Sequence, residues 1–224
     1  MGKTVITGAL TAAMRARGIH VGAMKPVASG AVKSASTLIS EDASFLMHAA
    51  QMPEEERRLV NPYCLEHPLA PLVAAELAHV SMDKDRILQA FHALQQNYPM
   101  ILVEGVGGIS VPLGRGYLVS DMAAEMELPL IIVARPGLGT LNHTVLTVEY
   151  ARQKGLTVLG VILNKWSGQP DNLVEQTNVD LIAALTGLPV IGRFPALSSL
   201  RTNNLVEAAN QSIELDYILE KAGV

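Results

Sequence analysis

Short runs of β-branched and other apolar residues recur along the chain, each bounded by glycine, proline or polar residues. Such runs are typical of strands that are buried on both faces of a sheet. Four strong runs and one weaker run predict five strands. They are Ile19–Met24, Met100–Val103, Leu128–Ala134, Val158–Leu163 and, as the weaker one, Pro189–Gly192.

Between these runs, apolar residues recur with the spacing of helices. The predicted helices are Thr4–Arg17, Asp42–Ala50, Asp83–Gln96, Thr140–Lys154 and Val179–Thr186, followed by a last helix within Leu205–Lys221. Strands that alternate with helices predict βαβ crossovers. We therefore expect one three-layer α/β domain over residues 1–224, with helices on both faces of a mainly parallel sheet. The Ser- and Ala-rich stretch Ala31–Glu41 is predicted to be a mobile loop.

Composition narrows the class of protein. Hydrophobic residues make up 49% of the 224 residues and charged residues only 17%, so the chain must bury a sizeable core. The net charge of −4 argues against a nucleic-acid partner. The single cysteine, Cys64, excludes an internal disulfide framework and is expected to be an inert, partly buried thiol. We expect neither a signal peptide nor a membrane span, which needs ~20 apolar residues, and we predict a cytoplasmic protein.

Ligands of parallel α/β sheets bind beyond the carboxyl ends of the strands. Glu104 follows the strand that ends at Val103, and three glycines lie within the next four residues. Because a buried carboxylate is costly unless it is paired or binds a cation, this pattern favours a magnesium ligand over a carboxylate that caps loop amides. Lys25 follows another strand. It is either an ordinary surface lysine or a cation for a transferring phosphoryl group.

Three further features sit where helices are predicted to begin. Gly2-Lys3-Thr4 is either an ordinary first turn or the back half of a phosphate-binding loop. Asp42 is equally consistent with helix capping and with metal binding. The stretch Gly139–His143 is either a Thr-capped helix start or a set of free amides that attracts an anion such as a carboxylate.

Taken together, these loops resemble the dethiobiotin synthase family of P-loop ATP-dependent carboxylases. The lysine loop and the glutamate loop, each behind a strand, form the most specific pair. The matching stretches run in order along nearly the whole chain: Gly2-Lys3-Thr4, Met24-Lys25-Pro26-Val27-Ala28-Ser29-Gly30, Asn61-Pro62-Tyr63, Leu102-Val103-Glu104-Gly105-Val106-Gly107-Gly108, Gly139-Thr140-Leu141-Asn142-His143 and Gly192-Arg193-Phe194-Pro195.

The resemblance implies a P-loop NTPase-like fold and a ligase that makes dethiobiotin from 7,8-diaminopelargonate, CO₂ and ATP through a phosphorylated carbamate. It also implies Mg²⁺ as the cofactor and a homodimer. By position, Lys3 and Lys25 would be the catalytic cations, and Thr4, Asp42 and Glu104 would hold the metal. The implied ATP-binding residues are Gly2, Lys3, Thr4, Asp42, Asn164, Lys165, Pro195, Ala196 and Leu197, with Asn164 at the adenine-reading position.

The substrate-binding residues that the resemblance implies are Ser29, Glu104, Gly105, Val106, Gly107, Gly108, Gly139, Thr140, Leu141 and Asn142. Ser29 would hydrogen-bond the carbamate or the attacking amine, and the loop from Glu104 to Gly108 would line the diamine site. The amides from Gly139 to Asn142 would bind the substrate carboxylate across the homodimer.

The chain departs from the family at its start. The family begins with a strand and a loop of the type GTDTxVGKT, whereas Met1 stands directly before Gly2 here. The first strand and the front of the phosphate loop are therefore expected to be missing. Each lost charge-assisted hydrogen bond to phosphate would cost roughly 1.5–3 kcal/mol of binding. One hypothesis is that Met1 occupies the position of a family valine whose GTG codon is read as a start; the alternative is a truncated, impaired chain.

Two other functions remain open. One is a non-catalytic P-loop remnant that has lost nucleotide binding. The other is a different ATP-dependent ligase of the same P-loop group, for example of the cobyrinate amidation type, which acts on large ring substrates. Calorimetric titration with Mg-ATP separates the enzyme from the remnant, because only the enzyme binds the nucleotide.

Overall fold

The computed structural model describes residues 2–34 and 37–223. Contacts between residues group the chain into two compact units. Unit 1 takes in Met1–Ala13 and Glu127–Val224, and unit 2 is Met14–Met126, so the division falls within α1 (Lys3–Ala16). The single domain expected from composition stays a prediction. Met1, expected to occupy a phosphate-loop position of the family, lies outside the described residues.

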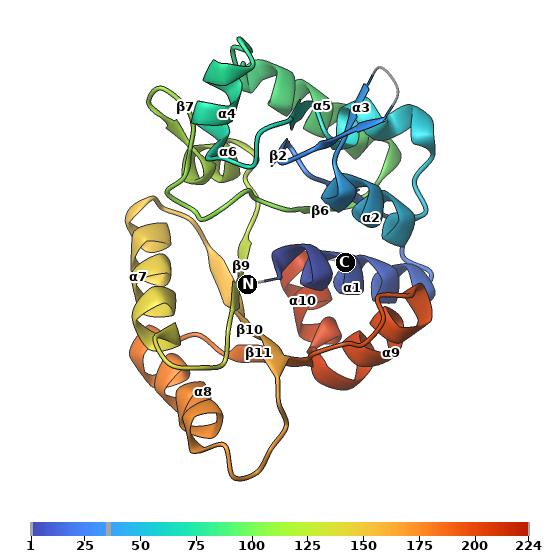
Figure 1. The fold of residues 1–224 in the computed structure, drawn as a ribbon. Helices are drawn as coiled ribbons and strands as arrows, with labels where there is room; N and C mark the ends of the chain where they lie inside the picture. Colours follow the sequence, from blue (N-terminus) through green and yellow to red (C-terminus); the bar gives the residue numbers. More distant parts are fainter. Residues whose placement is uncertain (1, 35–36, 224) are drawn as a thin grey trace. The chain divides into compact units, whose positions relative to one another are not determined.

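Unit 1 is built on three parallel strands in the order β11–β10–β9 (Figure 1). The strands are β9 (Leu130–Ala134), β10 (Val158–Trp166) and β11 (Val190–Pro195). The chain passes from β9 to β10 through α7 (Thr140–Gln153) and from β10 to β11 through α8 (Leu173–Thr186). These two βαβ crossovers confirm the α/β fold that the alternation of strands and helices predicts.

The core of unit 1 lies between this sheet and the helices α7 and α8. Val179 and Ile182 of α8 are buried against Val161 of β10 and its neighbours. Residues three and four apart lie on the same face of a helix, so this face of α8 covers the sheet. The full cluster is Ala134, Val161, Leu163, Val179 and Ile182, with Ile132, Leu141, Trp166 and Val190 packed against it.

The last predicted helix is in fact two helices, α9 (Thr202–Ser212) and α10 (Leu215–Ala222). They are separated at Ile213, which is extended and forms an isolated β-bridge with Gly192 of β11. The hydroxyl of Tyr217 in α10 donates to the carbonyl of Leu159 at 3.0 Å. Pairing with the sheet therefore interrupts a segment whose apolar spacing alone reads as one helix.

Unit 2 contains the parallel pair β1 (Val21–Met24) and β6 (Met100–Val103) and a second parallel pair, β2 (Val27–Ser29) and β5 (Tyr63–Leu65). Two antiparallel pairs join β3 (Val32–Ser34) to β4 (Thr37–Ile39) and β7 (Pro112–Gly114) to β8 (Tyr117–Leu118). The helices are α2 (Glu41–Ala50), α3 (Arg57–Val60), α4 (Pro71–Leu77), α5 (Lys84–Asn97) and α6 (Val119–Glu125), with a 3₁₀ turn at Glu54–Glu56.

The structure changes two expectations from the hydrophobic pattern. The stretch Ala31–Glu41 carries the strands β3 and β4, while residues 35–36 lie outside the described ones and the mobility of the stretch stays a prediction. Strands of three residues hold too little alternation to be recognised. Most residues of β6 and β9 are only partly buried, because among the described residues each pairs on one side only, β6 with β1 and β9 with β10.

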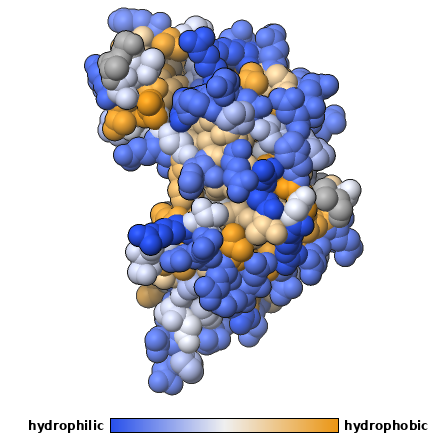
Figure 2. Space-filling model, turned by 90° about the vertical axis from the view of Figure 1, so that its right-hand side faces the viewer, coloured by the Kyte–Doolittle hydropathy of each residue, from blue (hydrophilic) through white to orange (hydrophobic). Residues whose placement is uncertain are grey.

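Hydrophilic residues cover most of the face shown in Figure 2, and apolar residues form separate patches on it. Among the residues that the structure describes, no helix is both long and apolar enough to cross a membrane.

Gly160 of β10 provides a test of this packing. A Cβ atom there would lie 2.8 Å from the carbonyl oxygen of Pro189 and 2.8 Å from Cγ2 of Ile191. We expect Gly160→Ala to lower the free energy of unfolding by about 1–3 kcal/mol, measured by urea denaturation, because backbone must shift to admit the methyl group. Gly137→Ala, where nothing lies within 4 Å, is the control and should cost little; equal costs would contradict the packing.

Candidate active site

Lys25 and Glu104 lie at the ends of the paired strands β1 and β6 in unit 2. The parallel register sets Met24 beside Val103, so the residue after each strand reaches the same edge. The Glu104 amide donates to the Met24 carbonyl at 2.8 Å, and Nζ of Lys25 lies 2.7 Å from Oε1 of Glu104. Lys25 is 4% exposed and Glu104 is 3% exposed. The two candidates that the sequence placed behind separate strands therefore form a buried ion pair.

Asp42 adds a second carboxylate to this pair. Its Oδ2 lies 3.2 Å from Nζ of Lys25, and its side chain is 48% exposed. Ser40 caps α2, because its side chain accepts a hydrogen bond from the Ala43 amide. The N-terminus of α2 is therefore capped by Ser40 and not by Asp42, and the Asp42 carboxylate lies beside the Lys25 ammonium. Lys25, Asp42 and Glu104 are called the Lys25 cluster below.

The charges of the Lys25 cluster suit a divalent cation. The Lys25 ammonium lies within 3.2 Å of oxygens from two carboxylates, so two hard oxygen donors lie close together. Magnesium is bound in proteins through one or two carboxylates together with substrate phosphates, rather than by a cage of protein ligands. The donor set of Asp42 and Glu104 fits this requirement. Among the described residues, no group of three or more His, Cys, Asp or Glu could hold a metal ion.

Asn61 fixes the backbone that carries Lys25. Its Nδ2 donates to the carbonyl of Lys25 at 2.7 Å and to the carbonyl of Tyr63 at 3.1 Å, and Asn61 is 8% exposed. The Lys25 amide in turn donates to the Val60 carbonyl at 2.8 Å. Beyond the family resemblance, sequence analysis assigns no role to Asn61. A polar residue between apolar Val60 and Pro62 was the available signal.

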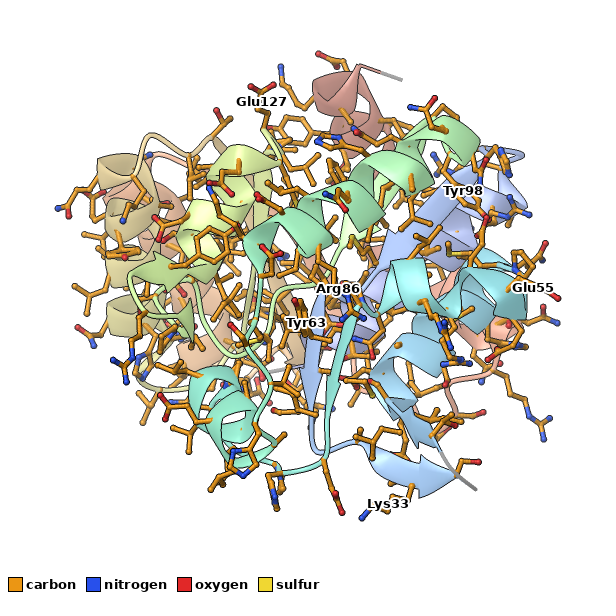
Figure 3. All side chains as sticks on the ribbon, turned by 90° about the horizontal axis from the view of Figure 1, so that it is seen from above. Lys33, Glu55, Tyr63, Arg86, Tyr98 and Glu127 are labelled. Carbon is orange, nitrogen blue, oxygen red and sulfur yellow. The ribbon has the colours of Figure 1, made fainter. Side chains whose placement is uncertain are left out.

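Tyr63 is itself fixed on its far side. Its hydroxyl accepts a hydrogen bond from the Asp83 amide at 2.7 Å, and the Arg86 guanidinium lies 4.8 Å from the centre of its ring. Figure 3 shows Tyr63 and Arg86 side by side. The stretch that carries Asn61 is thereby tied to the start of α5.

The glycine loop after Glu104 is anchored to the first turn of α6. The Ser120 amide donates to the carbonyl of Ile109 at 2.8 Å, and the Val119 amide donates to that of Val111 at 3.0 Å. The Val111 amide donates to the Gly108 carbonyl at 3.1 Å. Backbone bonds therefore set the path of the chain just beyond Gly105, Val106, Gly107 and Gly108. Ser29 ends β2 opposite Leu65 of β5, and its role stays a prediction.

In unit 1 the structure brings Gly2 and Asn164 together. Gly2 has a φ of +85°, and a Cβ atom there would lie 2.1 Å from Nδ2 of Asn164, so only glycine fits. Lys3 and Thr4 follow as the first residues of α1. The start of the candidate phosphate loop thus packs against the candidate base-reading residue, although the two are far apart in the sequence.

The end of β10 is irregular at the predicted nucleotide position. Lys165 has a φ of +64°, and the register with β11 shifts between Asn164 and Trp166. Beyond this bulge Trp166 pairs with Pro195, the last residue of β11, and the Arg193 guanidinium lies 5.4 Å from the centre of the Trp166 ring. Ala196 and Leu197 follow β11 directly.

The predicted carboxylate-binding segment begins α7. Gly139 precedes the helix, and the Thr140 amide donates to the Gly137 carbonyl at 3.2 Å. Thr140 is 1% exposed. The Thr140 amide is therefore already hydrogen-bonded within the chain, and the binding roles of Gly139, Leu141 and Asn142 stay predictions.

The predicted site residues divide between the two units. Unit 2 holds the Lys25 cluster, Ser29 and the glycine loop, and unit 1 holds the remainder. Within the units, the structure joins Lys25 to both carboxylates and joins Gly2 to Asn164. The roles of Lys3 and Thr4 toward the triphosphate stay predictions.

The chain is similar to known proteins in sequence. A family described as an AAA domain matches residues 1–204. ATP-dependent dethiobiotin synthetase BioD of Bacillus subtilis is 37% identical over 224 residues, covering 100% of this chain and 95% of that protein. The enzyme of the same name from Thermodesulfovibrio yellowstonii is 35% identical, covering 98% and 94%, and that of Bacillus cereus is 40% identical, covering 98% and 89%.

Solved structures share the fold. The MinD cell division protein of Aquifex aeolicus has a TM-score of 0.55 at 16% identity, covering 100% of this chain and 92% of that one. A ParA family ATPase of Chlorobium tepidum has a TM-score of 0.52 at 15% identity, covering 98% and 88%. The chain thus has an α/β fold with parallel strands that it shares with these proteins. The chain belongs to the family of ATP-dependent dethiobiotin synthetases, ligases that form carbon–nitrogen bonds.

Asn61 supplies a test of how Lys25 is held. Asn61→Ala leaves two buried carbonyl groups without their donor, so we expect the free energy of unfolding to fall by about 2–3 kcal/mol in urea denaturation. Asn97→Ala, which removes a hydrogen bond to Glu56 on the surface, is the control. An Asn61 variant as stable as the Asn97 variant would show that these bonds do not hold the segment.

Cys64 supplies a test of burial. Burial raises the pKa of its thiol. A hydrogen bond from the backbone of Ser40 and the charge of Arg57 lower this pKa, but by less than burial raises it. A raised pKa leaves less thiolate near neutral pH, so alkylation by iodoacetamide should be slow in the native protein and accelerate only at alkaline pH. Mass spectrometry of labelling between pH 7 and 10, with the urea-unfolded chain as the reference, measures this. Equal rates in the two states at pH 7 would contradict it.

Proposed function

We propose that this chain makes dethiobiotin from 7,8-diaminopelargonate, CO₂ and ATP, as its family membership suggests. In this reaction a carbamate forms on one substrate amine and its oxygen takes the γ-phosphoryl group of ATP. The neighbouring amine then attacks the carbamate carbon, which closes the ureido ring and releases phosphate. ADP and phosphate are the other products.

The observation that best supports this proposal is the Lys25 cluster. Phosphoryl transfer requires positive charge beside the γ-phosphate and a cation across the β- and γ-phosphate oxygens. A lysine at the carboxyl edge of β1, oriented by two carboxylates, is suited to the first task. The side chain is preorganised because its charge is held by Glu104 at 2.7 Å and by Asp42 at 3.2 Å.

Asp42 and Glu104 would hold Mg²⁺ in unit 2, and Thr4 keeps the ligand role that the resemblance gives it. When bound, the ion neutralises charge that develops on the phosphate oxygens. Lys25, held by the two carboxylates, would direct its ammonium toward the transferring phosphoryl group, and Lys3 would be the second cation.

The remaining roles belong to the same proposal. Asn164, Lys165 and the residues Pro195, Ala196 and Leu197 would bind the base of ATP, while Gly2 leads into the phosphate-binding turn. Ser29 and the loop from Glu104 to Gly108 would contact the diamine. The segment Gly139–Asn142 would bind the substrate carboxylate across a homodimer, and the protein would act in the cytoplasm.

The experiment that tests this function is a phosphate-release assay with bicarbonate, Mg-ATP and 7,8-diaminopelargonate. We expect release to require all three and dethiobiotin to appear in equal amount by mass spectrometry. Release that does not depend on the diamine would point to a different acceptor. No binding of Mg-ATP at millimolar concentration in calorimetry would contradict an enzymatic role.

Asp42→Asn tests the cluster without disturbing the core, because the Asp42 side chain is half exposed. Removing one carboxylate should lower kcat at least about tenfold and raise the Mg²⁺ concentration needed for half-maximal rate. Asp85→Asn, in the exposed first turn of α5, is the matched control and should leave both values unchanged. An unchanged Mg²⁺ requirement in the Asp42 variant would exclude it as a ligand.

A further inference from the structure

Two buried polar residues interrupt the apolar face by which α8 packs on the sheet of unit 1. Glu175 lies four residues before Val179 and seven before Ile182, which places its side chain on the same face as these core residues. Asn178 is its neighbour on that side, and both residues are 6% exposed. Polar groups are costly in such positions unless they are hydrogen-bonded, so the partners of these two side chains show what they do.

Glu175 holds the loop that leaves β10. Its Oε2 accepts hydrogen bonds from the Ser167 amide at 3.0 Å and from the Ser167 hydroxyl at 2.7 Å. A carboxylate in the first turn of a helix is also favoured by the helix dipole. These bonds fix the chain immediately after Trp166 and thereby constrain the bulge at Lys165.

Trp166 connects the loop after β10 to the end of β11. Its backbone pairs with Pro195, and the Arg193 guanidinium lies over its ring. Both segments that would border the base of ATP therefore depend on where Trp166 lies. Ser167 is exposed; its hydroxyl also accepts longer hydrogen bonds from the Gln169 amide at 3.3 Å and from Nδ2 of Asn172 at 3.4 Å, and the 2.7 Å bond to Glu175 is the shortest of the three.

Asn178 holds the other loop. Its Nδ2 donates to the carbonyl of Pro136 at 2.8 Å. Pro136 lies between β9 and α7, three residues before Gly139, in the segment that leads to the proposed carboxylate-binding amides. One helix face thus supplies a separate hydrogen-bonding side chain to each of two ligand loops.

We propose that Glu175 and Asn178 are positioning residues with separate tasks: Glu175 fixes the loop that binds the nucleotide base, and Asn178 fixes the loop that binds the substrate carboxylate. This inference rests on the proposed function of the two loops. Neither side chain touches a reacting atom. Each acts on the affinity for one substrate and leaves the chemical step largely unchanged.

The test is a comparison of steady-state constants in the full-length protein. Glu175→Ala should raise KM for ATP about tenfold, which corresponds to about 1.4 kcal/mol, with KM for the diamine and kcat changed less than about threefold. Asn178→Ala should raise KM for the diamine and leave KM for ATP unchanged. Asp180→Ala, an exposed residue of the same helix, is the control and should change neither.

Two further variants keep the test informative if Glu175→Ala does not fold. Glu175→Gln retains an oxygen that accepts the Ser167 hydrogen bonds and should restore most of the affinity for ATP. Ser167→Ala removes the hydroxyl that donates to Glu175, together with the hydrogen bonds that this hydroxyl accepts from Gln169 and Asn172, and should raise KM for ATP severalfold. The single tryptophan, Trp166, reports Mg-ATP binding by its fluorescence, which gives a readout independent of turnover.

The outcomes separate this inference from the proposed function. Asn164→Ala tests the base site directly. If it weakens ATP binding while Glu175→Ala and Ser167→Ala do not, the positioning role is wrong and the base site stands. If Asn164→Ala leaves ATP binding unchanged, the assignment of the base site fails. If the Glu175 and Asn178 variants raise both KM values alike, α8 has a general structural role and the separate tasks are excluded.

Discussion

The buried ion pair between Lys25 and Glu104 is the interaction on which the candidate active site depends. Burying either charge is costly unless the charge is paired, and both of these side chains are almost fully buried. The pair is possible because the parallel register of β1 and β6 delivers both residues to one edge. Asp42 adds a half-exposed carboxylate, so the cluster is closed toward the core and open toward a ligand.

Buried polar side chains hold three of the segments that follow strands in the candidate site. Asn61 fixes the backbone of Lys25, Glu175 holds the loop after β10, and Asn178 holds the loop after β9. Each side chain satisfies backbone groups that would otherwise be costly to bury. The loops proposed to bind ligands are therefore held by buried side chains of neighbouring segments.

Much of this protein could be predicted from local pattern. All five expected strands and the helices near Thr4, Asp42, Asp83 and Thr140 are present, because long apolar runs and helical spacing are strong signals. The helix α8 begins at Leu173, earlier than expected, because the polar stretch Glu175–Asn178 interrupts the apolar spacing before Val179. The short strands β2 to β5 carry too few residues to show alternation. The apolar spacing predicts one helix where the structure has α9 and α10, because the β-bridge at Ile213 that separates them has no signal in the sequence.

Sequence alone determined the class of fold, the two loops that carry Lys25 and Glu104, and the family, because these follow from residue types next to recognisable strands. The contact between that lysine and its carboxylates, the packing of Gly2 against Asn164 and the tasks of Glu175 and Asn178 were decided by tertiary structure. The reason is physical. Which polar groups become buried together depends on strand register and helix placement, and residues far apart in the chain share no local pattern that records it.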